Sequence, residues 1–262
     1  MIFISLWTIS CQTENSLKNE TKDISNEWTF PVIIDTIEFR TEDLNTTWIS
    51  RANYNLLYIG LPKDTIKNND RIRFIQPPPP PPGSGIKKYK KEFKNPLDGY
   101  YIDWLSERTY KSWNEVTIDI RIDTTTSIRK DVLQVERKSP YLRNYPVILT
   151  NIETDTIQIT YGNYLPLIME AKDSSDKWRP IEEERIYMCG VGIGSIILPP
   201  KQIALTSVIV FEGNYKTDLR LKIGQNYSNT FNGTINYRQF ESMFDNNGNY
   251  KQEYLNEQKK KK

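Results

Sequence analysis

The sequence predicts an all-β protein whose strands are mainly antiparallel and pack as a sandwich. Short runs rich in Ile, Val, Tyr and Thr alternate with turn residues along the chain. In Val116–Ile122 (VTIDIRI) and Leu219–Ile223 (LRLKI) apolar and polar residues alternate, which places one strand face on a core and the other in water. The runs recur at about the 8–12-residue spacing of β-sandwiches, and no long run shows the helical period of about 3.6 residues.

The expected strands are short, and each ends at turn residues. We expect a hairpin turn at Ser174–Asp176, and a short helix at Tyr237–Phe244, where Phe240, Met243 and Phe244 fall on one helical face. The strands are expected at Pro31–Phe39, Tyr54–Ile59, Val116–Ile122, Pro146–Thr150, Thr156–Tyr161, Pro166–Ala171, Ile203–Phe211 and Leu219–Ile223.

Changes in composition suggest five segments. Residues 1–11 form an apolar leader that ends in Cys11, and residues 12–27 are a polar tether. An N-terminal β region is expected over 28–144 and a β-sandwich over 145–245, because a Pro-bearing polar stretch separates two series of strands; 246–262 is a polar, basic tail. Six prolines at 77–82 predict a polyproline II segment outside the sheets, because proline has no N–H for a ladder. It serves as a stiff spacer or, alternatively, as a ligand for an aromatic groove.

Composition excludes several kinds of chemistry. The 262-residue chain has no His and 2 Cys, so it cannot build a Ser-His-Asp triad, a Cys-His dyad, a His-ligated metal site or a thiolate zinc site. Its 35 Lys+Arg against 33 Asp+Glu give a net charge of +2, which offers no reason to expect a nucleic-acid partner. The basic run Lys87–Lys94 is interpreted as a solvated segment, with contact to anionic phospholipid as the alternative.

The N-terminus resembles a bacterial lipoprotein signal. The apolar run Met1–Ile9 is followed by Ser10-Cys11 and then by a polar stretch, and it is shorter than the roughly 20 residues of a membrane span. The resemblance implies that Cys11 becomes the lipidated first residue of the mature protein, held at a membrane by its acyl chains. The alternative is a buried first strand. Cys189, in the apolar run IYMCGVG, is expected to be a buried structural residue or, less simply, the disulfide partner of Cys11.

The C-terminal half resembles immunoglobulin-like β-sandwich domains of bacterial envelope proteins. It has a strand that ends in Asn151, a hairpin that leads into Lys177-Trp178, a Leu198-Pro199-Pro200 lead-in and a Gly213-x-Tyr215 turn before a late strand. Over roughly the last 115 residues and the signal, the chain also resembles uncharacterised lipoproteins of Bacteroidota-type bacteria. The resemblance implies an immunoglobulin-like fold at the cell envelope and carries no activity. The Cys…Trp…Cys core of antibody domains is missing.

Two motifs that would bind phosphate or calcium fail on their spacing. Gly190–Gly194 reads G-x-G-x-G instead of G-x-G-x-x-G, and a strand-like SIILPP follows it where a dinucleotide loop needs a helix. A bend between strands explains it better. In Asp245–Asn249 the glycine stands at position four and not six of a calcium loop, so a polar turn is the better interpretation.

Two groups of side chains remain as candidate sites. Glu170 and the run Glu182–Glu184 could supply paired carboxylates for glycoside hydrolysis, although adjacent carboxylates on a strand usually point to different faces. The aromatic residues Trp104, Trp113 and Tyr101 could stack on sugar rings, or else form core and cross-strand pairs.

The leading hypothesis is a non-enzymatic binding or structural module of the bacterial cell envelope. It is expected at the outer membrane or the periplasmic face, with the membrane as a partner through the lipid on Cys11, an envelope protein or glycan as ligand, and no nucleic acid. No catalytic residue, cofactor or metal is expected. The alternatives are a carbohydrate-binding module that uses Trp104, Trp113 and Tyr101, and a carboxylate-based hydrolase that uses Glu170 or Glu182–Glu184.

Overall fold

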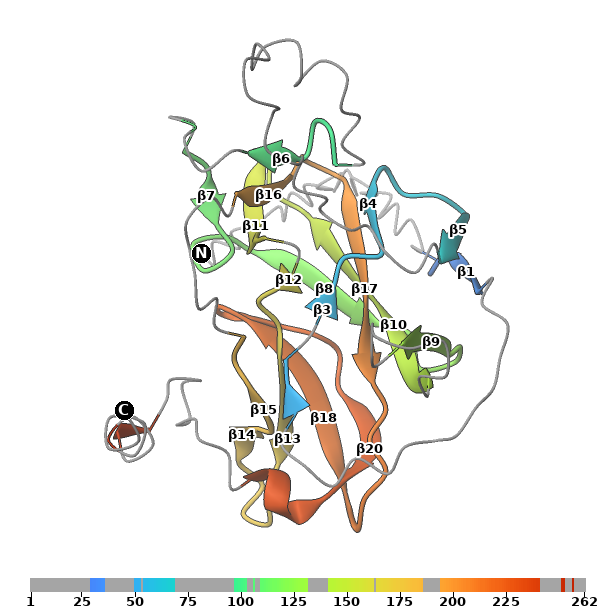
Figure 1. The fold of residues 1–262 in the computed structure, drawn as a ribbon, viewed down its shortest axis with the longest axis vertical. Coiled ribbons are helices and arrows are strands. Elements are labelled where there is room, and N and C mark those ends of the chain that lie inside the picture. The colour runs from blue at the N-terminus through green and yellow to red at the C-terminus, as the bar shows by residue number, and fades with distance from the viewer. Residues whose placement is uncertain are drawn as a thin grey trace, which may run out of the picture. The chain divides into compact units, whose positions relative to one another are not determined.

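In the part of the chain that the structure describes, strands are almost the only regular elements, which confirms the all-β prediction (Figure 1). We describe a computed structural model, in which two compact units are distinguished, Met1–Phe30 and Pro31–Lys262; every strand among the described residues belongs to the second. Each run of residues expected to form a strand overlaps an observed one, and the hairpin turn at Ser174–Asp176 is confirmed by the pairing of Lys172 with Trp178. The structure describes residues 29–35, 50–52, 54–68, 97–102, 106, 109–131, 141–162, 164–185, 194–240, 251, 252 and 256.

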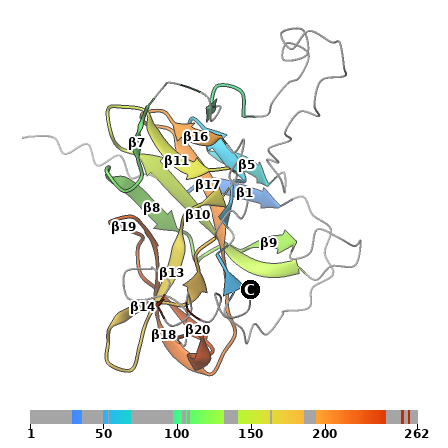
Figure 2. The ribbon, with the colours of Figure 1, turned by 60° about the vertical axis from the view of Figure 1, so that its left-hand side comes forward.

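The first large sheet, called here the β10 sheet, is antiparallel throughout. Its longest strand, β10, pairs along one side with β17 and along the other with β8 and then β9. Figure 2 shows β10 continuing past β8 to reach β9. The sheet contains β4 (Tyr58–Gly60), β17 (Ile203–Ile209), β10 (Tyr141–Asn151), β8 (Ile118–Ile122) and β9 (Ile128–Asp131).

The second sheet, the β11 sheet, is built from very short strands. β16 and β12 pair with β11 in antiparallel orientation, and β7 pairs with it in parallel. The strands are β3 (Tyr54–Asn55), β12 (Tyr164–Leu165), β11 (Ile157–Tyr161), β16 (Ser195–Leu198), β6 (Tyr101–Ile102) and β7 (Lys111–Ser112).

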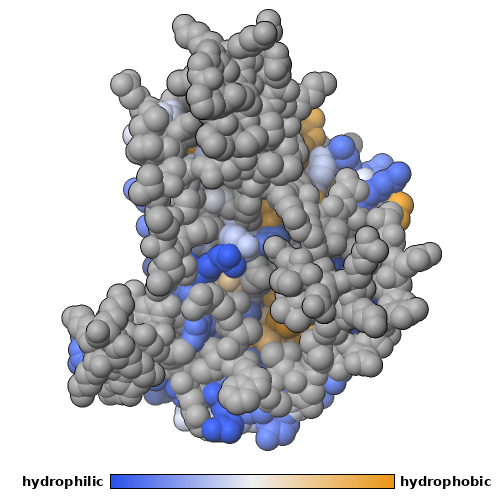
Figure 3. All heavy atoms as spheres, in the orientation of Figure 1, coloured by the Kyte–Doolittle hydropathy of each residue, from blue (hydrophilic) through white to orange (hydrophobic). Residues whose placement is uncertain are grey.

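The third sheet, the β18 sheet, is antiparallel, and hydrophilic residues predominate at its end of the molecule on the face in Figure 3. β13 lies on one side of β18, and β19 and β20 lie in succession on the other. The strands are β14 (Trp178–Pro180), β13 (Ile168–Lys172), β18 (Tyr215–Ile223), β19 (Asn226–Tyr227) and β20 (Phe231–Ile235). Two parallel pairs complete the set: β1 (Val32–Asp35) with β5 (Thr65–Asn68), and β15 (Glu182–Glu183) with β2 (Ser50–Arg51).

The boundary expected between residues 144 and 145 falls inside β10. Except for the β1–β5 pair, each described strand before residue 141 pairs with a strand that lies between residues 141 and 235. The two expected regions therefore share their sheets. Where a helix was expected over Tyr237–Phe244, a 3₁₀ helix, η1, spans Tyr237–Phe240, and 241–244 lie outside the described residues.

The core is continuous across the three large sheets. β8 alternates as its sequence predicts, with Ile118, Ile120 and Ile122 buried and the residues between them less so. β17 is buried on both faces over Ile203–Val208, and this explains a continuous apolar run in place of an alternating one. At about 0.025 kcal/mol per Å² of apolar surface removed from water, this burial is the main stabilising contribution.

Two asparagine side chains join the β18 sheet to the edge of β8. Asn226 Oδ1 accepts from the Ile118 N–H at 3.0 Å, and its Nδ2 donates to the Val116 carbonyl at 3.0 Å. Asn229 accepts from the Ile122 N–H at 2.7 Å and donates to the carbonyl of the same residue at 3.1 Å. Both side chains thus act like a pairing strand and satisfy backbone groups that would otherwise be exposed at a sheet edge.

Candidate functional site

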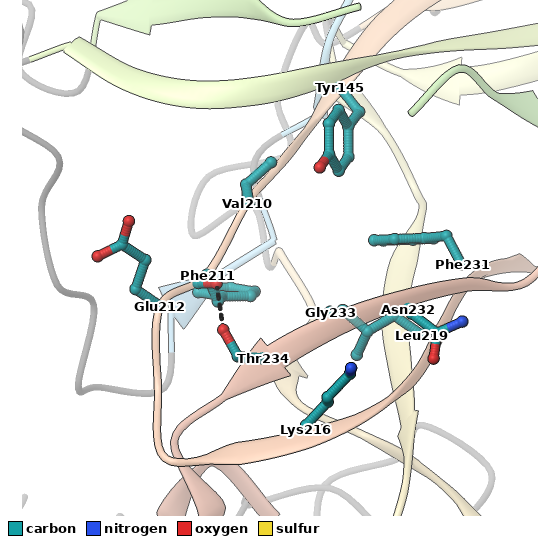
Figure 4. A pocket seen from close by; sticks show the side chains of 10 residues that line it. All are labelled: Tyr145, Val210, Phe211, Glu212, Lys216, Leu219, Phe231, Asn232, Gly233 and Thr234. Atoms are coloured by element: carbon teal, nitrogen blue, oxygen red, sulfur yellow. Dashed lines mark hydrogen bonds between the residues drawn. The ribbon is translucent and has the colours of Figure 1, made fainter. Parts of the chain in front are cut away.

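A cavity of about 370 Å³ lies between the β10 and β18 sheets, and we call it the interlayer pocket (Figure 4). Three elements supply its walls: β10, the segment that follows β17, and the β18–β20 pair. Its volume is at the lower end of the roughly 300–1,000 Å³ range of small-molecule sites. The lining residues are Tyr145, Val210, Phe211, Glu212, Lys216, Leu219, Phe231, Asn232, Gly233 and Thr234.

Tyr145 reaches the pocket from a break beside β10. On that side of β10 the β9 ladder ends at Asn144 and the β8 ladder begins at Val147. Pro146, which has no N–H, stands in this break, and its carbonyl accepts from the Asp123 N–H at 3.1 Å. Pairing on the other side, with Val208 and Ser207, holds Tyr145 and Pro146 in the sheet.

Gly233 lies in the wall of the pocket, in close contact with the Leu219 side chain. Phe231 and Ile235 are buried, and Gly233 shares their face of β20 because side chains alternate along a strand. A Cβ at position 233 would lie 2.5 Å from Leu219 Cδ1 and 3.8 Å from Phe231 Cε2, two atoms of the pocket wall. A larger residue would therefore have to displace the Leu219 side chain, which itself lines the pocket, and glycine permits this close packing of β20 against Leu219.

The deep part of the pocket is aromatic and apolar. The rings of Tyr145 and Phe231 meet edge to face, with centroids 5.9 Å apart and planes at 89°, and Figure 4 shows them facing each other from the two layers. Leu219 and Phe211 are buried at 1% and 2% exposure. An aromatic pair of this geometry contributes about 0.5–1.5 kcal/mol beyond its area.

The rim of the pocket is polar and carries both signs of charge. Glu212, Lys216 and Asn232 are exposed, so their side chains are free to turn toward a ligand. Thr234 fixes one side of the mouth: its Oγ1 donates to the Phe211 carbonyl at 3.1 Å and accepts from the Gly213 N–H at 3.4 Å. A rigid apolar floor thus lies below adaptable hydrogen-bonding groups.

Glu170 stands on the outer face of the β18 sheet, away from the pocket. Its Oε2 accepts from Arg220 Nε at 2.8 Å and from Nη2 at 2.6 Å, and Lys222 Nζ lies 3.8 Å from Oε1. The Arg220 guanidinium lies 4.1 Å from the Trp178 ring centroid and 3.9 Å from that of Tyr227. This carboxylate is therefore held by two guanidinium N–H groups on one oxygen, and the guanidinium lies against two aromatic rings.

Glu182 is buried at 2% exposure and acts as a hydrogen-bond acceptor inside the fold. Its Oε2 accepts from the Tyr54 hydroxyl at 2.5 Å and from the Met169 N–H at 2.9 Å. Burial first, and then the Glu182 charge, raise the pKa of Tyr54 well above its ordinary value, which keeps this hydroxyl a donor. Burial also raises the pKa of Glu184.

The aromatic group expected from the sequence is divided between strands. Tyr101 lies in β6 and Trp113 directly follows β7, and β16 and β11 lie between these two strands. Both side chains are half-buried against the core, and the Trp113 carbonyl accepts from Asn226 Nδ2 at 3.3 Å. Trp104, Cys11, Cys189, and the runs 77–82, 87–94, 190–193 and 245–249 lie outside the described residues.

Sequence reasoning missed the interlayer pocket. One signal for this region was present: Gly233 interrupts an otherwise regular strand pattern at an inward position, where glycine marks the close approach of another segment. Nothing in the sequence shows that Tyr145 and Val210 face this gap. Among the residues that the structure describes, no cluster of three or more Cys, Asp or Glu is arranged to hold a metal ion.

Comparison of the chain with known protein families, with curated proteins and with solved structures yields no match. Within the described part of the chain, no helix has the length and apolar character needed to cross a bilayer.

Proposed function

We propose that the chain is a non-enzymatic ligand-binding module of the bacterial cell envelope, and that its ligand enters the interlayer pocket. The observation that carries this proposal is the pocket itself: a cavity of about 370 Å³ with an apolar, aromatic floor and a few polar groups at its mouth. Sites for small ligands have this composition.

The positions of the carboxylates favour binding over hydrolysis. Glycoside hydrolysis needs two carboxyl groups that face one cleft, about 5–9.5 Å apart. Glu170 is held by Arg220, Glu182 accepts from Tyr54, and Glu212 is the one carboxylate among the residues that line the pocket. The chain has no His that could act as acid or base.

The proposed location at the cell envelope is based on the N-terminal sequence alone. A lipidated Cys11 would hold the module at the outer membrane or the periplasmic face, with the polar tether of residues 12–27 between the anchor and the sheets. Labelling of cells with a fatty-acid probe tests it: we expect label on the wild type and none on Cys11→Ala. Equal labelling of the two proteins would remove the lipid anchor from the proposal.

The binding function is tested by crosslinking in envelope preparations. We expect the full-length wild type to retain an envelope component that Gly233→Leu, with its pocket filled, does not retain. Thr230→Leu is the matched control, because it adds the same side chain at an exposed residue just outside β20. Equal retention by Gly233→Leu and the wild type would contradict the proposal, and so would no retention by either.

A further inference from the structure

The groups at the pocket mouth indicate the chemistry of the ligand. Lys216 supplies N–H donors, Glu212 supplies acceptors, and the Asn232 amide supplies both. The positive charge of Lys216 and the negative charge of Glu212 balance each other, so the side chains of the rim have no net charge. A phosphate or carboxylate ligand is recognised by an excess of cationic groups, and a cationic ligand by the reverse. A balanced rim of donors and acceptors fits a neutral ligand that carries many hydroxyl groups.

The floor adds a second requirement. Tyr145 and Phe231 present aromatic carbon to the cavity, and Leu219 and Val210 add aliphatic carbon. A ligand for this site therefore needs an apolar surface at its inner end as well as polar groups at its outer end. A pyranose ring has both, since its C–H groups gather on the ring faces and its hydroxyls project around the rim.

We infer that the interlayer pocket binds a neutral saccharide, with the C–H face of one sugar ring against the Tyr145–Phe231 pair and its hydroxyls toward Lys216, Glu212 and Asn232. This inference rests on the proposed ligand-binding function and names its ligand class. It places the sugar at a site other than the Trp104, Trp113 and Tyr101 group that the sequence suggested. An apolar peptide side chain suits the floor equally well but leaves the charged and amide groups of the rim without partners, and burying such groups unpaired is unfavourable.

The test is a binding titration with the full-length protein followed by saturation-transfer NMR. The probes are neutral trisaccharides of hexoses and N-acetylhexosamines, a glucuronate-containing trisaccharide, and an apolar tripeptide. We expect a neutral trisaccharide to bind and to receive saturation mainly on its ring C–H protons. Tyr145→Ala should weaken binding about tenfold, equivalent to about 1.4 kcal/mol. Gly233→Leu should abolish binding, and Lys216→Met should weaken it by a smaller factor.

Two control variants locate the site. Trp113→Phe changes the sequence-predicted aromatic group and Thr230→Leu adds bulk outside the pocket, so both should bind as the wild type does. If circular dichroism shows that Gly233→Leu does not fold, Tyr145→Ala and Lys216→Met test the location of the site instead. Neither of these substitutions adds bulk to the pocket.

The possible results distinguish a wrong ligand class from a wrong binding function. Binding of the tripeptide or the glucuronate-containing trisaccharide in preference to all neutral trisaccharides would overturn the saccharide inference and leave pocket binding intact. Neutral-trisaccharide binding that Trp113→Phe removes and Tyr145→Ala does not would overturn the location. If no probe binds while the wild type still retains an envelope component that Gly233→Leu does not, the ligand class is wrong and the proposed function stands.

Discussion

The two faces of the β18 sheet solve the packing of their side chains in opposite ways. On the outer face, Glu170 and Arg220 form a hydrogen-bonded ion pair, the guanidinium contacts the rings of Trp178 and Tyr227, and Lys172 contacts Asp218 at 3.3 Å. On the inner face, Leu219, Phe231 and Gly233 border the interlayer pocket. The outer face is filled with mutually satisfied groups, whereas the inner face retains an unfilled cavity bordered by polar residues.

Whether a charged or aromatic side chain already has partners within the fold indicates whether it contributes to stability or to binding. Side chains whose partners lie within the fold have little capacity left for a ligand, and their loss exposes unpaired groups. Side chains that border a cavity without filling it leave that capacity free. We therefore expect mutations on the outer face to lower the free energy of unfolding, and mutations at the pocket to change ligand binding with smaller effects on stability.

The largest expected effect belongs to Arg220→Ala. It leaves the Glu170 carboxylate, whose side chain is 5% exposed, with Lys222 at 3.8 Å as its nearest cation, and it removes the contacts of the guanidinium with the Trp178 and Tyr227 rings. We expect a loss of about 3 kcal/mol in the free energy of unfolding, measured with denaturant. Arg143→Ala is the control: its exposed guanidinium lies 5.7 Å from the Tyr145 centroid, so its loss should cost less than about 1 kcal/mol. Equal losses would contradict the contrast between the faces.

Asn226→Ala should have the next largest effect. The side-chain amide of Asn226 accepts from the Ile118 N–H and donates to the Val116 and Trp113 carbonyls. The substitution removes all three hydrogen bonds, and these backbone groups lose this partner. We expect a loss of about 2 kcal/mol in the free energy of unfolding. Hydrogen exchange should report faster exchange of the Ile118 amide in particular. Asn232→Ala, at an exposed residue, should change stability by less than about 0.5 kcal/mol and leave that amide protected.

A pair of glycine variants sharpens the comparison at the pocket. In Gly233→Ala the new Cβ meets the end of the Leu219 side chain, which can move into the cavity, so the cost should be about 1 kcal/mol or less. In Gly213→Ala the Cβ would lie 2.1 Å from the Ile235 carbonyl carbon, part of the backbone, which cannot move so easily. Thermal unfolding should therefore show a clearly lower melting temperature for Gly213→Ala. The reverse order would show that the pocket does not yield to an added methyl group.

The smallest expected effect is a pH dependence at the β13–β14 turn. The Lys177 N–H donates to Asp173 and lowers the pKa of this carboxyl more than burial raises it, and the Ser175 N–H adds to the shift. A carboxyl with a lowered pKa in the folded state contributes stability at pH values above its ordinary pKa of 3.8, and this contribution is lost as the pH falls through the lower folded pKa. Between about pH 4 and pH 2, the wild type should therefore lose more stability than Asp173→Asn. Parallel profiles in denaturant titrations would contradict the role of this turn.

More of the fold than of the candidate site could be predicted from the sequence. Period-2 runs located the strands at Ile118–Ile122 and Leu219–Ile223, because local alternation records which face of a strand is buried. The same reasoning proposed a boundary inside β10, because the pairing of β8 and β9 with β10 depends on contacts between residues far apart in the chain. Glu170 looked like a candidate catalytic residue until the structure placed Arg220 beside it.

The sequence by itself determined the all-β class, the positions of the main strands and the exclusion of imidazole chemistry, since each of these depends on composition or on neighbours within a few residues. The tertiary structure alone decided which carboxylates are paired, which aromatic residues share a site and where a cavity remains. These properties depend on strand order and register, which bring Tyr145, Val210 and Gly233 to one place. A one-residue slip in register would turn every side chain of β20 to the other face, and no local pattern fixes that choice.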